Sequence, residues 1–390
     1  MKILYIAYAF PPVNIVSAQR AMFQARYLAE AGAEVTVICA EQTRNRDDDS
    51  LLKYMKNTPH LTIHRITPWG RKDEFGDGGF KPSAKGFLWV FRVLLLVRKL
   101  LRTKSFDLVY TTFGPKYPHM TGRIIHSAYK LQWVAEYRDP WNGSEHNASK
   151  YSSLSFEFER WLMKPALLIV AVSLGLKQLL QKIHGNRRQY AVVYNGFEPG
   201  AYGRSVPVPS SQPSQHASVI HLILAGTVYP FQREALQLLL RGLQGRDDVT
   251  FSYYGASAPL VQSLVNAETL QSICRINDQV SHEHIVEALL QADVAVLPIS
   301  RTFVGQLPVK FYDYLAARKP VLMLKGAGTE IEELMNKTHS GFNAETVADI
   351  STWLDEVQVG KLSYSFSGAD FFTRENQAKC LLRIMNESIK

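Results

Sequence analysis

The sequence contains few cysteines and no long uncharged hydrophobic segment. Cys39, Cys274 and Cys380 lie far apart, with no CxxC pair and no metal-ligand spacing, which predicts reduced thiols and no bound metal. No uncharged apolar run reaches the roughly 20 residues of a membrane span. The apolar run near the N-terminus is short and ends at Pro11-Pro12 without a signal-peptide cleavage pattern. We therefore expect a cytoplasmic protein.

Acidic residues are outnumbered by basic ones. Lys and Arg total 44 and Asp and Glu total 35, so the net charge is 44 − 35 = +9. This excess favours anionic partners such as phosphates, nucleic acid or the cytoplasmic face of a membrane. We expect no nucleic-acid partner, because the sequence has no recognition motif and no interleaving of basic with aromatic residues.

Short apolar runs alternate with helical patterns along most of the chain. Most runs are continuously apolar, as in Ile3–Tyr8 and Asp107–Thr112, which indicates parallel strands buried on both faces. A second βα array of similar size begins near Val219. The sequence therefore predicts an α/β protein of two doubly wound domains, with ligands beyond the carboxyl ends of the strands and in a cleft between the domains.

The predicted boundaries follow a change in composition. Residues 200–217, rich in Pro, Ser and Gly, are expected to form a linker. They separate an N-terminal domain, 1–199, from a C-terminal domain, 218–365. Residues 366–390 are expected to form a C-terminal helix that is a candidate to pack back on the first domain.

The order of several motifs resembles family 4 glycosyltransferases of the GT-B fold, in particular bacterial enzymes that make cell-surface polysaccharides. The resemblance covers nearly the whole chain. It rests on the segments "YAFPPVNIVSAQR", "WVAEYRDPW", "VVYNGFEP", "LAGTVYPFQREALQLLL" and "GQLPVKFYDYLAARKPVLML". It implies two Rossmann-like domains, an acceptor site in the first and a nucleotide-sugar site in the second. It also implies retention of the anomeric configuration and no metal or other cofactor.

The segment "GQLPVKFYDYLAARKPV" is expected to bind the donor. Backbone N–H groups of Gln306 and Leu307, just before a helix N-terminus, would hold the diphosphate. Lys310 and Asp313 lie three residues apart on one helical face. Lys310 would add charge to the phosphates. Asp313 stands where the family has a ribose-binding glutamate, so it would accept hydrogen bonds from ribose hydroxyls.

Arg233 is the candidate for stabilising the leaving diphosphate, where negative charge develops as the glycosidic bond breaks. Two positions depart from the family pattern. Gly305 stands where relatives often have an acid near the donor sugar, and Thr227 stands where they have an arginine. These departures make the retention of activity a question for experiment.

The first domain is expected to bind the acceptor. The Pro-Pro turn has no glycine, so the side chains of Asn14 and Ser17 would contact acceptor hydroxyls, and Arg20 would meet an acceptor phosphate or the donor diphosphate. His119, after another strand, is expected to contact the donor sugar or position the acceptor. Asp139 is expected to orient the acceptor hydroxyl or act as a base, or else to pair with Arg138 and fix its loop.

The segment Lys85–Arg102 is the most hydrophobic part of the chain. Its basic residues gather on one face of a helix, although apolar residues interrupt that face. The pattern suits a helix in an anionic membrane interface and also a core helix with a solvated stripe. The residues expected at the membrane, at the inner face of the plasma membrane, are Arg92, Arg98, Lys99 and Arg102.

The resemblance predicts a glycosyltransferase that moves a sugar from a nucleotide-sugar to a glycan or lipid-linked acceptor. Two alternatives remain open. One is a non-catalytic relative of this fold that binds a membrane or protein partner, which the departures at Gly305 and Thr227 favour. The other is a nucleotide-sugar epimerase, which the lack of a dense carboxylate cluster disfavours.

Overall fold

The computed structural model describes residues 1–41, 49–67, 84–142, 153–202, 219–300 and 307–389. They form two compact units. The first comprises residues 1–195 with the C-terminal segment 374–390, and most of the remaining chain, from 196 to 373, forms the second. Most of the predicted linker, 200–217, lies outside the described residues.

The N-terminal unit is built on a seven-stranded sheet in the order β3-β2-β1-β4-β5-β6-β7, with every described pairing parallel. The strand bounds are β1 Lys2–Ile6, β2 Glu34–Ala40, β3 Leu61–Ile66, β4 Leu108–Thr112, β5 Gln132–Tyr137, β6 Leu168–Ala171 and β7 Gln189–Val192. The order reverses between β1 and β4, so the carboxyl ends of these strands form the edge where such sheets bind ligands.

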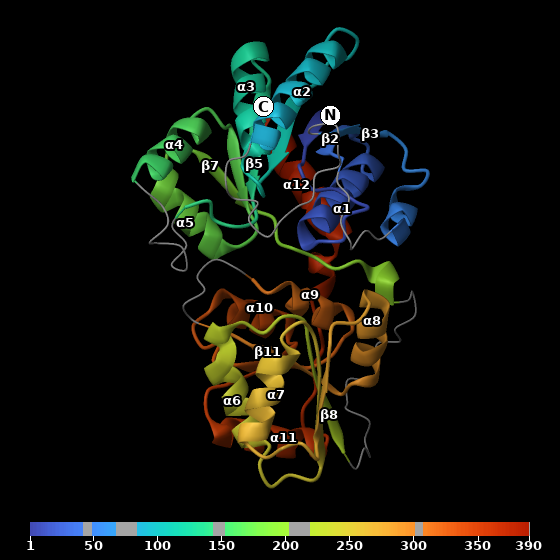
Figure 1. Cartoon of the computed structure of the whole chain (residues 1–390), viewed down its shortest axis with the longest axis vertical. Coiled ribbons are helices and arrows are strands. Elements are labelled where there is room, and N and C mark those ends of the chain that lie inside the picture. The colour runs from blue at the N-terminus through green and yellow to red at the C-terminus, as the bar shows by residue number, and fades with distance from the viewer. Residues whose placement is uncertain (42–48, 68–83, 143–152, 203–218, 301–306, 390) are drawn as a thin grey trace. The chain divides into compact units, whose positions relative to one another are not determined.

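Helices cover both faces of this sheet. Their bounds are α1 Val16–Glu30, α2 Ala84–Leu100, α3 Tyr117–Tyr129, α4 Ser153–Met163, α5 Leu174–His184 and α12 Arg374–Ile389, with the 3-10 helix η1 at Asp49–Met55. Two apolar clusters fill the space between sheet and helices, one centred on Trp89 and Trp133 and the other on Met22 and Leu28. Although α12 ends the chain, it packs beside α1 in this unit (Figure 1).

The second unit repeats the plan with a six-stranded parallel sheet in the order β10-β9-β8-β11-β12-β13. The strands are β8 Ile220–Ala225, β9 Val249–Tyr254, β10 Cys274–Asn277, β11 Val294–Pro298, β12 Val321–Leu324 and β13 Gly341–Ala344. The helices are α6 Arg233–Gly242, α7 Ala258–Ala267, α8 His282–Gln291, α9 Val309–Ala316, α10 Glu330–Thr338 and α11 Val347–Gln358. Short 3-10 helices lie at η3 Pro199–Tyr202, η4 Pro230–Gln232 and η5 Ala369–Phe372. The predicted fold class, two doubly wound α/β domains, is confirmed.

Candidate functional site

In the second unit, the candidate donor residues gather where β8 and β11 end. Gly226 follows β8 with φ +90°, a left-handed conformation that favours glycine. A Cβ at this position would be in ordinary van der Waals contact with the Lys310 Cε, 3.7 Å away. The Lys310 Nζ donates to the Thr227 carbonyl at 3.2 Å. The turn after β8 and the first turn of α9 therefore meet around one ammonium group.

Burial lowers the pKa of Lys310 from its ordinary value to about 8, although the nearby Asp313 carboxylate acts in the opposite direction. Lys310 is partly exposed by accessible surface, so its ammonium is partly desolvated, and the lowered pKa indicates that Asp313 does not fully compensate for that desolvation. A bound phosphate would supply a further counter-charge and restore the protonated form. The electrostatics of this position therefore suit an anion.

Asp313, one turn further along α9, is engaged by a residue that the sequence did not indicate. The Tyr202 hydroxyl donates to the Asp313 Oδ1 at 2.9 Å. Tyr202 is 5% exposed, and its ring meets the edge of His282. It lies at the end of η3, in a segment whose composition suggested a linker. The hydrogen bond from the Tyr202 hydroxyl to one carboxylate oxygen therefore fixes the orientation of the Asp313 side chain.

The remaining donor candidates occupy varied positions. Leu307 is buried, whereas Gln306 and Gly305 lie outside the described residues. Arg233 begins α6 and is exposed. The preceding Gln232 is buried, donates to the Pro298 carbonyl at 2.8 Å and accepts from the Tyr229 N–H. Gln232 therefore ties the turn after β8 to the end of β11 and holds Arg233 at that edge.

In the first unit, the Pro-Pro turn is linked to the C-terminal helix. The Gln19 Nε2 donates to the Asn14 Oδ1 at 2.7 Å, and the Arg374 Nη2 donates to the Gln19 Oε1 at 3.2 Å. Arg374 also lies over the ring of Phe23 at 4.2 Å. Ser17, in the first turn of α1, is partly exposed. The candidate acceptor residue Asn14 is thus oriented by a chain of contacts that ends on α12.

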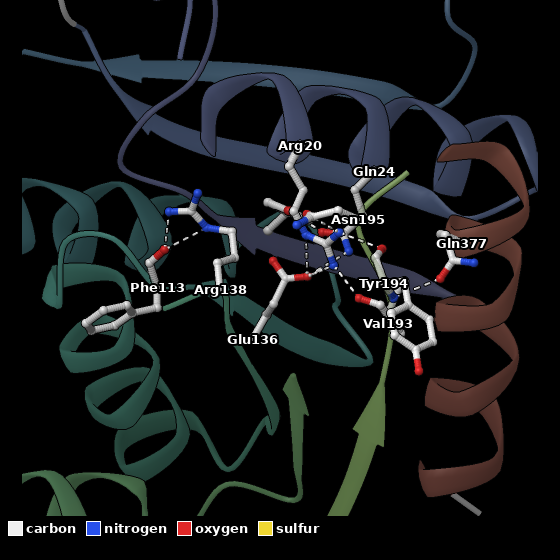
Figure 2. A network of polar contacts seen from close by, with 10 residues as sticks. Arg20, Gln24, Phe113, Glu136, Arg138, Val193, Tyr194, Asn195 and Gln377 are labelled. Carbon is white, nitrogen blue, oxygen red and sulfur yellow. Dashed lines mark hydrogen bonds and ion pairs between the residues drawn. The ribbon is translucent and has the colours of Figure 1, made fainter. Parts of the chain in front are cut away.

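Arg20 is bound within the N-terminal unit (Figure 2). Its Nη2 and Nε lie 2.7 and 3.1 Å from the Glu136 Oε1, and its Nη2 and Nη1 donate to the carbonyls of Val193 and Tyr194. The Nη1 also donates to the Asn195 Oδ1 at 3.1 Å. All five N–H groups therefore have partners inside the unit, and these contacts support a structural role instead of the ligand contact expected from the sequence.

Glu136 is fully buried near the end of β5. Burial alone would raise the pKa of its carboxyl, but Arg20 outweighs that effect, and Gln24 adds a hydrogen bond at 3.0 Å, so the net shift is downward. Charge-assisted hydrogen bonds offset the cost of burying this pair. The sequence contained no signal for it, because the two partners are separated by 116 residues.

His119 lies in the core, not at the surface expected from the sequence. Its side chain is 0% exposed, its Nδ1 is 2.8 Å from the Thr111 hydroxyl, and aromatic rings including Phe113 and Tyr137 surround it. Burial lowers its pKa to about 3, so the ring is neutral at physiological pH. The physical reason is that α3 directs this face of its first turn onto the sheet. The contacts support a role in packing.

Asp139 and Arg138 follow β5 at the carboxyl edge, and both are partly exposed. The alternative of a direct pair between them is not what the structure shows: Arg138 donates instead to the Phe113 carbonyl, with its Nε at 2.9 Å (Figure 2). Asp139 acts on Arg138 through longer-range electrostatics. Asp139 thus remains at the edge expected for an acceptor-binding residue.

Helix α2 buries one face and exposes another. Trp89, Val93 and Val97 are buried in the core. The outer surface carries Phe87, Phe91 and Leu95, which are 48%, 57% and 53% exposed. The basic residues Arg92, Arg98, Lys99 and Arg102 are also exposed. Among the helices in the described ranges, none has both the length and the apolar content to cross a membrane.

Comparisons with known proteins agree with the fold described above. The model of Glycosyltransferase Family 4 matches residues 18–200. Sucrose-phosphate synthase from Thermosynechococcus elongatus superposes with a TM-score of 0.69 at 14% identity, covering 99% of this chain and 98% of that chain. Anabaena HepE, solved with UDP and glucose, gives 0.67 at 15% identity over 99% and 100% of the two chains. The apo lipopolysaccharide outer core galactosyltransferase WaaB gives 0.62 at 13% identity over 99% of each chain. No curated protein matches in sequence.

Proposed function

We propose that this chain, which has the GT-B fold, is a glycosyltransferase, because its residues 18–200 match the model of Glycosyltransferase Family 4. In this proposal it transfers a hexose or related sugar from a nucleotide-sugar to a glycan or lipid-linked acceptor. A UDP-sugar is the first donor to consider, because HepE was solved with UDP and with UDP-glucose. The product would belong to a cell-surface polysaccharide.

The observation that carries this proposal is the cation and carboxylate pair on α9. Lys310 lies against the turn after β8, and Asp313 is fixed by the Tyr202 hydroxyl. A diphosphate at Lys310 and a ribose at Asp313 would satisfy both groups, since a carboxylate accepts two hydroxyl hydrogen bonds and an ammonium donates three. Backbone N–H groups at Gln306 and Leu307 would add to diphosphate binding.

The proposed chemistry is transfer with retention of the anomeric configuration. Negative charge develops on the diphosphate as the glycosidic bond breaks, and Lys310 and Arg233 are the cations proposed to stabilise it. The leaving diphosphate would take the acceptor proton, so positioning of the acceptor by Asn14, Ser17 and Asp139 contributes more than a strong base does. This route requires no metal or other cofactor.

Peripheral membrane binding is the second part of the proposal. The exposed apolar residues of α2 lie beside its exposed cations, and the helix packs against α3, on which Ile124 is also 41% exposed. Such a surface suits the anionic cytoplasmic face of the plasma membrane. A lipid-linked acceptor would be reached from that surface.

Two alternatives are weighed by the same residues. Gly305 and Thr227 favour a non-catalytic relative. The arrangement of Lys310, Asp313 and Tyr202 opposes it, because packing of the domain does not require a lysine whose pKa is lowered. A nucleotide-sugar epimerase would need a compact acid–base set beside the donor sugar. In the described part of the second unit, Asp313 is the carboxylate whose charge acts on Lys310. One carboxylate does not make such an acid–base set, and this disfavours the epimerase.

The test is the thermal stability of the full chain with UDP, GDP, ADP or CMP, for the wild type and Asp313→Ala. Stabilisation by one nucleotide, reduced in the variant, supports the donor site and identifies the base. Incubation with the matching nucleotide-sugars then measures transfer. Absence of stabilisation by all four at millimolar concentration would favour the non-catalytic relative.

A further inference from the structure

The Nε and Nη2 groups of Arg138 fix the position of its guanidinium. The Nε and Nη2 both bind the Phe113 carbonyl, at the end of β4. The guanidinium packs closely against the backbone at Gly114. Gly114 has φ +102°, and a Cβ there would lie 2.3 Å from the Arg138 Nη2. A side chain at Gly114 would therefore displace the guanidinium.

The other half of the guanidinium has no partner among the residues that the structure describes. The Nη1 of Arg138 makes no hydrogen bond with them, and no carboxylate of theirs lies within 4.0 Å of the group. Glu136 and Asp139 act on it only at longer range, and burial lowers its pKa. A half-buried arginine of this kind leaves strong donors unused at the ligand-binding edge of the sheet.

A second cation flanks the same turn. The Lys116 Nζ lies 5.5 Å from the ring centroid of Trp141, which stacks on the Phe113 ring at 5.8 Å. Lys116 is partly buried and makes no ion pair within the described residues. Trp141 and Phe113 therefore place Lys116 on the turn whose carbonyl fixes Arg138.

From these contacts we propose that Arg138 and Lys116 bind a phosphoryl group of the acceptor, so that the natural acceptor is a phosphate ester. Arg20, the cation expected to meet an acceptor phosphate, is instead saturated by Glu136 and backbone carbonyls. A phosphate monoester carries close to two negative charges, which matches two cations that form no ion pair with the described residues, and its oxygens suit the arginine fork. This inference rests on the proposed glycosyltransferase function and deepens it.

The phosphate could be carried by a prenyl lipid or by a sugar. The experiment separates these sources with two probes, geranyl phosphate and glucose 6-phosphate, and uses glucuronate as a carboxylate control. All titrations are made by calorimetry on the full chain saturated with UDP, so that the donor site is already occupied. The variants are Arg138→Met, Arg138→Lys and Lys116→Met. The matched control is Arg123→Met, which removes an arginine of the same unit that stacks on Trp161.

We expect the wild type to bind one phosphate ester and not glucuronate. Arg138→Met should weaken that binding by about tenfold or more, as the loss of a charge-assisted hydrogen bond does. Lys116→Met should weaken it less, Arg138→Lys should restore part of it, and Arg123→Met should leave it unchanged. UDP affinity should be the same in all variants.

Four results would overturn the inference: no binding of either ester, equal binding of glucuronate, equal loss in Arg123→Met, or a loss of UDP affinity in Arg138→Met. The last would assign these cations to the donor diphosphate. Failure of the wild type to bind any nucleotide would contradict the proposed function itself, which is a distinguishable outcome.

Discussion

Arg20 of α1 and Glu136 of β5 form a buried ion pair, with the Nη2 2.7 Å from the Oε1 and side-chain exposures of 10% and 0%. The same guanidinium binds the backbone after β7, and the Tyr194 N–H donates to Gln377 of α12 at 2.9 Å. This pair therefore joins a helix, a central strand and the last segment of the N-terminal unit before the chain enters the second unit.

Removal of one partner should destabilise the N-terminal unit strongly. Arg20→Met leaves the Glu136 charge buried without a counter-charge from Arg20, with hydrogen bonds from Gln24 and Thr112. Loss of one partner of a buried pair typically costs about 3–5 kcal/mol. Urea denaturation of the wild type, Arg20→Met, Glu136→Gln and the double variant would measure the effect. We expect the double variant to lose much less than the sum of the single losses.

The matched control for that series is Arg26→Met. Arg26 pairs with Glu30 at 2.8 Å on the surface of the same helix, and exposed pairs contribute about 0–1 kcal/mol. If Arg20→Met costs no more than Arg26→Met, the ion pair with Glu136 does not stabilise the domain and the structural role is wrong.

These two residues also show what the sequence could and could not predict. The apolar runs predicted the parallel strands because strands buried on both faces need continuous apolar residues, and the position of Arg20 on α1 followed from helical periodicity. The partner of Arg20 depends on which strand lies beside which, and strand order is not encoded in local pattern. A ligand-facing role and an internal role for Arg20 were therefore indistinguishable before the fold was known.

The same limit applies to the second unit. Lys310 and Asp313 were found because their spacing on one helix is local information. Tyr202 was missed because it reaches Asp313 across 111 residues from a segment rich in Gly and Pro. Strand β13 gives little local signal, since Gly341–Ala344 has only one fully buried residue and so lacks the apolar run that marks a central strand.

Lys310→Met should separate stability from nucleotide binding. The folded-state pKa of about 8 lies below the ordinary 10.5, so at pH 7 the folded protein bears the full cost of burying a charged ammonium. That cost disappears as pH rises through about 8 to 10.5, where the folded form loses its proton first. The ligand-free variant should therefore melt about 2–4 °C higher at pH 7, the shift that about 1 kcal/mol gives, and nearer the wild type at pH 9.5.

The same variant should lose the stabilisation by UDP that we expect of the wild type. Wild-type UDP affinity should also fall as pH rises above about 8, because the lysine that binds the phosphate becomes neutral, whereas the residual affinity of Lys310→Met should not change there. Calorimetric titrations at pH 7 and pH 9 measure both. A wild-type affinity that is flat over this range would contradict a phosphate contact by Lys310.

Tyr202→Phe should weaken nucleotide binding without unfolding the second unit. It removes the hydroxyl that fixes the Asp313 carboxylate, and a hydrogen bond to a charged group contributes enough to predict a loss of about threefold to tenfold. The discrimination between UDP and its 2′-deoxy analogue should decrease in parallel. Tyr364→Phe is the control, since it removes a hydroxyl that accepts from the Trp353 indole in the same unit. Equal affinities in both variants would argue against ribose binding at Asp313.

His119 should make the N-terminal unit sensitive to acid. Its folded-state pKa of about 3 lies below the ordinary 6.5, so the unfolded chain takes up a proton first and stability falls as pH decreases below about 6.5. His119→Asn, which can keep a hydrogen bond to Thr111, should show a smaller loss of unfolding free energy between pH 7 and pH 4.5. Its transfer activity at pH 7 should stay within about twofold of the wild type; a folded variant with abolished transfer would restore the catalytic role expected from the sequence.

The surface of α2 should bind anionic vesicles through both its charges and its apolar residues. Arg98→Glu with Lys99→Glu should reduce co-sedimentation with vesicles that contain phosphatidylglycerol by more than tenfold, since each basic residue near such a surface contributes about 1 kcal/mol. Phe87→Ser with Phe91→Ser should reduce binding also at high salt, where the electrostatic term is screened. The control is Lys182→Glu with Arg187→Glu, which reverses two exposed charges elsewhere on the same unit. If the two charge-reversal variants lose binding equally and Phe87→Ser with Phe91→Ser loses none, the net charge of +9 and not this helix determines vesicle binding, and α2 is a core helix with a solvated face.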